Sequence, residues 1–295
     1  MPVKQASPPP GLPRVAAREP VRYVFVGKRA KAGAPFPSRP SVARVYDYLL
    51  GGKDNFSVDR SHGQWITAMV PEVPAGVRAQ RALLRRVVRY LVADEGIGQL
   101  LDVGAGLPTN ENVHQIAQHI DPSVRVVYVD NDPVVVAHGK AMLAENPATI
   151  VVEGDLRVPA AIIGHPLVRT HLDWTRPIGL LLSGVLHLVM DFERPAELTA
   201  ALIRALPSGS YVFIQHLLDL DDPAAVQLRK LMTRSFGRVQ FRSLEQVRDL
   251  FDGLELVAPG LVRVPDWRPG EEDVPAPEDQ LTALGLACAG VARKP

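Results

Sequence analysis

The sequence predicts an α/β protein built on a doubly wound, mostly parallel β-sheet, and three observations support this prediction. From residue 99 onward, short apolar runs alternate with amphipathic stretches of helical period. The apolar run 99–103 leads into a turn with two glycines, Asp102-Val103-Gly104-Ala105-Gly106. Aspartates end three successive apolar runs, at Asp102, Asp130 and Asp155. Repeated strand–helix units form parallel sheets, which bind ligands at the carboxyl ends of their strands.

Composition indicates an ordinary globular chain that buries one large core. Of 295 residues, 46% are hydrophobic and 22% are charged, and the net charge is +1. This charge gives no general attraction to nucleic acid or to a membrane surface, so neither is an expected partner. The single cysteine, Cys288, excludes an intramolecular disulfide and a multi-cysteine metal site. We expect a cytoplasmic protein with no secretion signal and no membrane span.

The first residues differ in composition from the rest. Residues 1–36 are rich in Pro, Ala, Gly and Arg without periodicity, so we expect a disordered tail. Residues 37–76 are expected to form a helical lid segment. One helix has Val42, Val45, Tyr46 and Leu49 on one face and ends at Gly51, and a second spans 57–70.

The segment Gly51-Gly52-Lys53-Asp54-Asn55-Phe56 is unusual for a plain connection. Glycines permit close backbone approach, and the polar side chains after them can converge on a ligand. The alternative is a helix–helix turn carrying a Lys–Asp surface pair. From the residues alone, both interpretations stay open.

A helix is expected over 77–91, with Leu83, Leu84, Val87, Val88 and Leu91 on its buried face. Its other face carries Arg78, Arg81, Arg85 and Arg89. A basic stripe can contact nucleic-acid phosphates, but no aromatic residues interleave with it. We interpret it as the solvated face of a packed helix.

The alternation then predicts each element in order. Strands are expected at 99–103, 124–129, 149–152, 178–182 and 211–215, with an antiparallel closing pair at one edge formed by 254–264 and 287–293. Helices are expected from 109 or 110, at 133–144, 196–205 and 223–236, and after a capping box of Ser243 and Gln246.

The strand-end residues indicate an adenosine ligand without phosphates. A carboxylate after the second strand suits both hydroxyls of a ribose, and Asp155 can accept from an adenine amine. A dinucleotide site needs a third glycine where this chain has Thr109, and no Walker-type Gly-Lys-Ser/Thr sequence occurs. We therefore expect S-adenosylmethionine (SAM), with Asp102 near its cationic amino-acid end. No carboxylate cluster has metal-ligand spacing, so no metal is expected.

Two motifs carry a resemblance to a known family. The run Val42–Phe56 and the turn Asp102–Thr109 resemble the signatures of a bacterial, mostly actinobacterial, S-adenosyl methyltransferase family, formerly a domain of unknown function. Weaker similarities follow at 127–133, 154–157, 185–187, 267–269 and 290–295, so the resemblance covers about residues 37–295. Gln80 and Cys288 depart from the family pattern, and both are expected to lie away from the cofactor.

The resemblance implies a class I, Rossmann-like methyltransferase fold: a seven-stranded sheet whose last strand is antiparallel, with SAM bound by residues 77–295. It also favours Gly51–Phe56 as a lid over the cofactor. Expected cofactor contacts are Asp102, Gly104, Gly106, Asp130, Asn131, Asp155, Leu156 and Ser183, together with Gly52, Lys53 and Asn55 of the lid.

The acceptor of the methyl group is less defined by the sequence. His187 follows the fourth strand and is the candidate general base, although a histidine there is more often structural. Asp191, His216, Tyr46 and Tyr48 are weaker candidates for this region. The absence of an Asp/Asn-Pro-Pro-aromatic motif disfavours DNA bases, so a small-molecule acceptor is expected. The alternatives are a SAM-binding sensor or scaffold without turnover and a nicotinamide-dependent (NAD) oxidoreductase.

Overall fold

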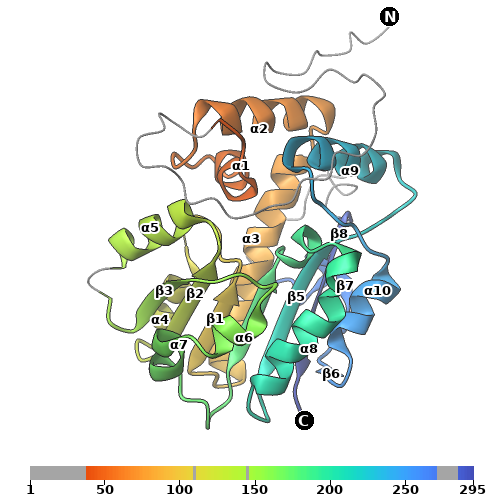
Figure 1. Cartoon of the computed structure of the whole chain (residues 1–295). Coiled ribbons are helices and arrows are strands. Elements are labelled where there is room, and N and C mark those ends of the chain that lie inside the picture. The colour runs from red at the N-terminus through yellow and green to blue at the C-terminus, as the bar shows by residue number, and fades with distance from the viewer. Residues whose placement is uncertain (1–37, 109–110, 144–145, 271–284) are drawn as a thin grey trace, which may run out of the picture.

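The computed structural model describes residues 38–108, 111–143, 146–270 and 285–295. Within these ranges one mixed sheet of eight strands forms the centre of the molecule (Figure 1). The strands are β1 Gln99–Val103, β2 Arg125–Asp130, β3 Thr149–Glu153, β4 Gly179–Ser183, β5 Tyr211–Leu217, β6 Glu255–Leu256, β7 Val262–Arg263 and β8 Ala287–Arg293.

The helices separate into those that cover the sheet and those that lie above its strand ends. They are α1 Val42–Leu49, α2 Ser57–Met69, α3 Val73–Arg89, α4 Val113–Ile120, α5 Pro133–Met142, α6 Pro159–Ile163, α7 Pro166–His171, α8 Pro195–Ala205, α9 Pro223–Phe236 and α10 Leu244–Arg248. Figure 1 shows α1, α2 and α9 above the carboxyl ends of the parallel strands, where they form a cap.

The strand order is β3-β2-β1-β4-β5-β8-β6, with β7 paired to β8 beside β6. Strands β1 to β5 are parallel, and β8 is antiparallel to β5, which confirms the expected class I topology. The chain crosses from β3 back to β4 beside β1, so the order reverses between β1 and β4. In open α/β sheets a ligand crevice lies at this reversal.

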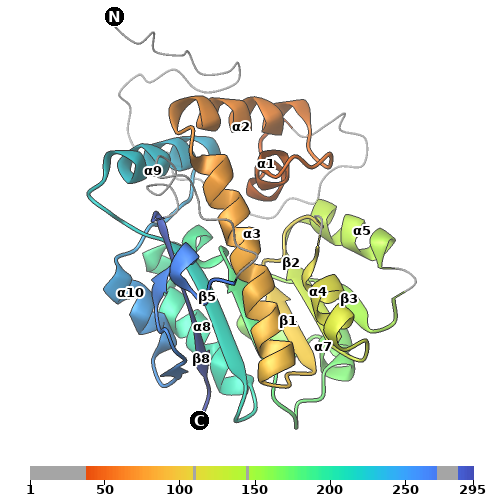
Figure 2. The same cartoon turned by 180° about the vertical axis from the view of Figure 1, so that it is seen from behind.

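Alternating strand residues build two cores, one on each face of the sheet. Leu100 belongs to the core shared with α3, whereas its neighbour Leu101 belongs to the core shared with α6, α7 and α8. Both leucines are completely or almost completely buried. Figure 2 shows α3 running from the cap down the back of the sheet. Because both faces are covered, the parallel strands carry continuous apolar runs rather than an alternation of apolar and polar residues.

Most expected elements of the alternating region are present with ends shifted by one or two residues. The first cap helix α1 ends before Gly51, whose φ of +81° is the left-handed conformation expected there. The capping box is also confirmed, since Gln246 N donates to Ser243 Oγ and Ser243 N donates to Gln246 Oε1. The expected boundary between residues 76 and 77 falls inside the continuous helix α3.

Two expectations need correction. Segment 254–264 is two short strands rather than one, because Pro259 lacks the N–H that a continuous ladder needs. Both strands pair antiparallel with β8, which lies between them and β5, so the expected antiparallel pair at this edge of the sheet is confirmed. In addition, α6 and α7 were not predicted, although each begins at a proline in its first position.

Two expectations fall on residues that the structure does not describe. The tail 1–36 and the helix start at Thr109 or Asn110 lie outside the described residues; α4 begins at Val113. Among the described helices, none combines the length and apolarity needed to cross a bilayer.

Candidate functional site

A cavity of about 390 Å³ lies where the cap meets the strand ends. Its floor is formed by the residues that follow β1, β2, β3 and β4, and its walls come from α1, α2, α3 and α9. Of the expected site residues, nine line this one cavity: Asp102, Gly104, Gly106, Asp130, Asn131, Asp155, Leu156, Ser183 and His187.

The double-glycine turn depends on glycine at both positions. Gly104 and Gly106 have φ values of +77° and +69°, which disfavour residues with a side chain. A Cβ on Gly104 would also lie 2.4 Å from Val185 Cγ2, whereas a Cβ on Gly106 would meet nothing within 4 Å. The turn is held by Gly104 N, which donates to Val129 O at 2.8 Å. Backbone therefore approaches the cavity closely at this point.

Asp102 is a buried carboxyl at the end of β1, and only 4% of the residue is exposed. Its Oδ1 atom has no hydrogen-bond partner among the described residues. Burial raises the pKa of Asp102 to about 7, with Arg81 lowering it and Asp130 raising it to a smaller extent. A buried carboxylate oxygen without a partner is costly, so this site favours a ligand that supplies a positive charge.

Asp130 ends β2 and is tied to the glycine turn. Its Oδ2 accepts from Gly106 N and its Oδ1 accepts from Asp132 N, both at 2.9 Å. Burial raises the pKa of Asp130, while these two backbone hydrogen bonds lower it. The carboxylate is thus fixed in orientation at the cavity floor, next to Asn131.

Asp155 follows β3 and belongs to a short polar chain. Asn131 Nδ2 donates to Asp155 Oδ2 at 3.2 Å, and Arg157 N donates to Asp155 Oδ1 at 2.9 Å. Burial opposes ionisation of Asp155, but these hydrogen bonds and the Arg157 charge leave its pKa lowered. Leu156 is buried beside it and provides an apolar surface in the same cavity.

His187 lies one short turn after β4, and the ring is almost completely buried. Burial lowers its pKa to about 3, with further lowering by His216 and Arg242, so the ring is neutral at physiological pH. Its Nδ1 atom has no partner within the described part of the chain. The ring meets His216 edge-on, with the two centroids 5.9 Å apart.

Arg242 contacts His216 and leaves this histidine without a free ring nitrogen for acid–base catalysis. Its guanidinium lies 2.8 Å from His216 Nε2 and donates to Leu186 O, Val189 O and Asp191 Oδ1. His216 Nδ1 lies 2.7 Å from Leu217 O, so both ring nitrogens of His216 are engaged. Asp191 is likewise bound to Arg242 and does not line the cavity.

Gly52, Lys53 and Asn55 do not line the cavity, contrary to the arrangement expected for cofactor contacts. Asn55 Nδ2 instead donates to Asp47 Oδ2 at 2.8 Å and to Gly52 O at 3.0 Å. A Cβ on Gly52 would lie 2.0 Å from Asp47 Oδ1, so glycine is required for this packing. Gly52 and Asn55 shape the turn between α1 and α2. Ser41, directly before α1, lines the cavity together with Tyr46 and the apolar face of α1.

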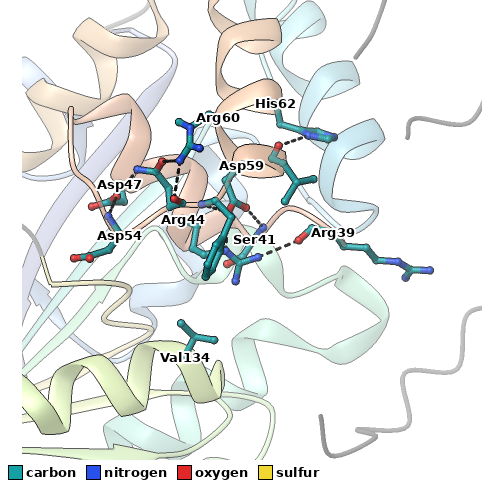
Figure 3. Close-up of polar contacts among 12 residues, drawn as sticks. Arg39, Ser41, Arg44, Asp47, Asp54, Asp59, Arg60, His62 and Val134 are labelled. Carbon is teal, nitrogen blue, oxygen red and sulfur yellow. Dashed lines mark hydrogen bonds and ion pairs between the residues drawn. The ribbon is translucent and has the colours of Figure 1, made fainter. Parts of the chain in front are cut away.

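A buried ion pair joins the two cap helices to the cofactor side of the sheet. Arg44 Nε donates to Asp59 Oδ2 at 2.8 Å, and Asp59 also accepts from Ser41 N and Phe56 N (Figure 3). Arg44 additionally lies 3.7 Å from Asp132 Oδ2, two residues after Asp130. The cap is therefore connected directly to the loop that follows β2.

Comparison with known proteins identifies the chain. Residues 36–295 match the model of a family described as S-adenosyl methyltransferase. The chain belongs to this S-adenosyl methyltransferase family. Its cofactor is accordingly SAM, and it is a SAM-dependent methyltransferase.

Two crystal structures are closely similar to this methyltransferase. A candidate methyltransferase from Thermobifida fusca YX is 40% identical, with a TM-score of 0.82 over 87% of this chain and 95% of its own. A DUF574 family protein from Streptomyces avermitilis is 35% identical, with a TM-score of 0.82 over 87% of this chain and 98% of its own. Among curated proteins, no sequence matches this chain.

Several cavity residues of the methyltransferase were not anticipated from its sequence. The sequence predicts a solvated face for Arg81, yet Arg81 lines the cavity and donates to Glu111 O at 2.8 Å. Gln80 also lines the cavity, although it was expected to lie away from the cofactor. Gln215 and the inner face of α9 complete the wall. Helical period alone could place Arg81 and Gln80 on α3 but could not show which side faces the cavity.

Proposed function

We propose that the methyltransferase holds SAM across the ends of β1, β2 and β3 and transfers its methyl group to a small molecule. The observation that carries this proposal is the unpartnered, buried Oδ1 of Asp102 at the floor of the shared cavity. The residues around it fit the cofactor, because they offer a carboxylate for a cation and polar groups for an adenosine.

Asp102 is proposed to bind the ammonium group at the amino-acid end of the cofactor. Its unpartnered oxygen gains a charge-assisted hydrogen bond there, which is stronger than a hydrogen bond between neutral groups. The turn Gly104–Gly106 lets the ligand lie close to backbone because no side chain projects from the two glycines. Ser183, at the end of β4, lines the same part of the floor.

Asp130 and Asp155 are proposed to recognise the adenosine part. Asp130 is oriented by two backbone N–H groups and suits the ribose hydroxyls, with Asn131 beside it. Asp155 is held by Arg157 and Asn131 next to Leu156, which offers an apolar contact for the base. Gly52, Lys53 and Asn55 are proposed to act indirectly, by holding α1 over the cavity.

The protein contributes to catalysis chiefly by placing the acceptor. When bound, SAM supplies an electrophilic methyl group on a positively charged sulfur. Alignment of an acceptor with such a group accounts for up to ~7–11 kcal/mol in ideal cases. His187 is proposed to orient the acceptor as a neutral hydrogen-bonding group at the cavity surface, since its lowered pKa of about 3 makes it a weak base.

Turnover is favoured over a sensor or scaffold by the extent of the cavity. A sensor would need no space beyond the cofactor, and a closed surface beside His187 would indicate one. The cavity instead continues past His187 to Leu217 and to Leu228, Met232 and Phe236 of α9. The helices α1, α2 and α9 lie above the carboxyl ends of the strands (Figure 1), and side chains of all three line this space. The arrangement suits an acceptor small enough to fit beneath the cap.

Titration calorimetry with SAM and with NAD tests the cofactor site, and mass analysis of a library of small molecules incubated with SAM tests the transfer. We expect SAM binding without NAD binding, and a gain of one methyl group by at least one small molecule. Binding of NAD but not of SAM would contradict the proposal. SAM binding with transfer only to protein or nucleic acid would retain the cofactor assignment and reject the small acceptor.

A further inference from the structure

The cavity changes in chemical character along the strand order β3-β2-β1-β4-β5-β8. At the ends of β1, β2 and β3 it presents three carboxylates, Asp102, Asp130 and Asp155. At the ends of β5 and β8 the strand residues are Leu217 and Ala287. These two ends of the cavity are separated by β4, because β4 lies between β1 and β5 in the sheet.

The end beside β5 and β8 is enclosed by apolar side chains from four helices. We call this part the apolar chamber. Its walls are Val45, Tyr46 and Leu49 of α1, Ile66 of α2, Val73, Val77 and Leu84 of α3, Leu228, Met232 and Phe236 of α9, and Leu217, Leu286 and Ala287 of the strand ends. Tyr46 keeps its hydroxyl near Val77 O, at 3.5 Å, so its ring supplies apolar surface.

Two polar groups stand at the border between the carboxylates and the apolar chamber. Gln215 on β5 pairs in register with Ser183 on β4, and His187 follows β4 by one short turn. A methyl group added to Gly184 would lie 3.1 Å from Gln215 Oε1 and 3.3 Å from His187 Cε1. The ends of both side chains therefore flank Gly184, and both residues line the cavity.

Both side chains retain an unused hydrogen-bonding atom. Gln215 is 1% exposed and His187 is 7% exposed. Across the described ranges, neither Gln215 Nε2 nor His187 Nδ1 has a hydrogen-bond partner. Buried polar atoms are normally satisfied, so a pair left open on a cavity wall indicates groups that a ligand satisfies.

A hydroxyl group matches this pair. The amide Nε2 of Gln215 is a donor, and a neutral imidazole nitrogen is a donor or an acceptor according to its tautomer. A hydroxyl both donates and accepts, so it satisfies the two atoms whichever tautomer His187 adopts. A carboxylate only accepts, and it would bring a charge against the apolar side chains of Leu217, Leu228 and Met232, which is unfavourable. Arg81 of α3 is a cation that lines the same cavity, and its charge acts on Asp102 and on Tyr46.

We propose that the apolar chamber binds an uncharged, largely apolar acceptor, and that Gln215 and His187 orient a hydroxyl group of this acceptor at the border with the cofactor end. This inference rests on the proposed function, since it names the class of acceptor for the same cavity. Gln215 becomes a specificity-determining residue, and α9 supplies the outer wall of the acceptor site.

Binding of three matched probes tests the proposal without turnover. The probes are 2-naphthol, 2-methylnaphthalene and 2-naphthoate, which carry a hydroxyl, a methyl and a carboxylate on one ring system. Binding is measured by ligand-observed NMR on the full chain saturated with S-adenosylhomocysteine, whose own affinity is first measured by calorimetry. We expect 2-naphthol to bind most tightly and 2-naphthoate least tightly.

Three variants separate the hydroxyl contact from the apolar wall. We expect Gln215→Leu to weaken 2-naphthol about fivefold, the usual cost of one neutral hydrogen bond, with no loss for 2-methylnaphthalene. Met232→Glu places a charge in the apolar chamber and should weaken both probes about tenfold or more. Lys230→Glu adds the same side chain on the exposed face of α9 and should change neither affinity. S-adenosylhomocysteine binding, expected to stay unchanged in all three, reports correct folding.

The outcomes distinguish this inference from the proposed function. If S-adenosylhomocysteine does not bind but the probes still bind in the expected order, the proposed cofactor site is rejected and the proposed apolar chamber is retained. Three results would overturn the apolar chamber: tightest binding by 2-naphthoate, no binding of any probe with the cofactor site intact, or equal affinities for Met232→Glu and Lys230→Glu. An unchanged preference for 2-naphthol in Gln215→Leu would reject the hydroxyl contact.

Discussion

Arg44 Nε donates to Asp59 Oδ2 at 2.8 Å, and neither side chain has more than 6% of its surface exposed. Asp59 also accepts from the backbone N–H groups of Ser41 and Phe56, so one carboxylate fastens the start of α1 to the start of α2. The same guanidinium reaches Asp132 beside the cofactor end. This contact makes the cap a continuation of the site rather than a separate unit.

Loss of the Asp59 carboxylate should destabilise the fold strongly. Asp59→Ala leaves Arg44 buried without its main partner, and breaking a buried pair in this way typically costs ~3–5 kcal/mol. Urea unfolding measures the change in the free energy of unfolding. Asp266→Ala is the control, because its pair with Arg263 is exposed and should contribute less than about 1 kcal/mol. Equal effects of the two substitutions would contradict the role of this pair.

The two glycines of the turn should respond differently to alanine. Gly106→Ala imposes only a left-handed conformation on a residue with a side chain, a cost of about 1–2 kcal/mol. Gly104→Ala adds a clash with Val185 and should cost clearly more. Thermal unfolding of both variants compares the two costs directly. A larger loss in Gly106→Ala would show that contact with Val185 does not determine the turn.

Removal of the Asp130 carboxylate should weaken the cofactor. We expect Asp130→Ala to reduce SAM affinity by ~1–3 kcal/mol, since a hydrogen-bond acceptor for the ribose is lost. Glu153→Ala is the matched control, because Glu153 ends β3 and pairs in register with Asp130 of β2 but does not line the cavity. Calorimetry that finds no difference between these two variants would reject Asp130 as a cofactor contact.

The raised pKa of Asp102 predicts a pH dependence of cofactor binding. Burial raises this pKa to about 7, so the free protein holds Asp102 protonated below that pH and ionised above it. A cationic ligand prefers the ionised form. SAM affinity should therefore rise between pH 6 and 8, about one pH unit on each side of the pKa, and then level off. Asp102→Asn removes this contribution while it retains the shape of the side chain. Parallel pH profiles for wild type and variant would exclude Asp102 from binding the cation.

Stability should fall as the pH drops below about 6.5. Burial lowers the pKa of His187 to about 3 and of His216 to about 4, whereas in the unfolded chain a histidine has a pKa of about 6.5. Between these values the unfolded state binds more protons, so the free energy of unfolding rises with pH, by up to ~1.4 kcal/mol per pH unit for each group.

Urea unfolding between pH 5.5 and 7 measures this slope. His187→Gln should flatten it, because this variant lacks one of the two histidines whose pKa is lowered by burial. The prediction fails if the variant retains the wild-type slope.

The sequence by itself determined the alternating α/β order, the glycine turn and the three aspartates at strand ends. These features are local: apolar runs, caps and residues with positive φ each depend on a few neighbours in the chain. Because the carboxyl ends of parallel strands lie at one edge of a sheet, the prediction of parallel strands was enough to place Asp102, Asp130 and Asp155 near one another, and all three line the cavity.

Only the tertiary structure decided what the cap does and what the acceptor meets. Gly52 packs against Asp47, and Asn55 donates a hydrogen bond to it. Arg81 lines the cavity, and residues of α1 and α9 together form the walls of the apolar chamber. The closeness of Gln215 and His187 arises from the pairing of β4 with β5, across a long separation in the chain. Such contacts depend on how elements that are distant in the sequence pack together. Residue periodicity predicts which face of a helix is buried, but it does not predict which element that face contacts.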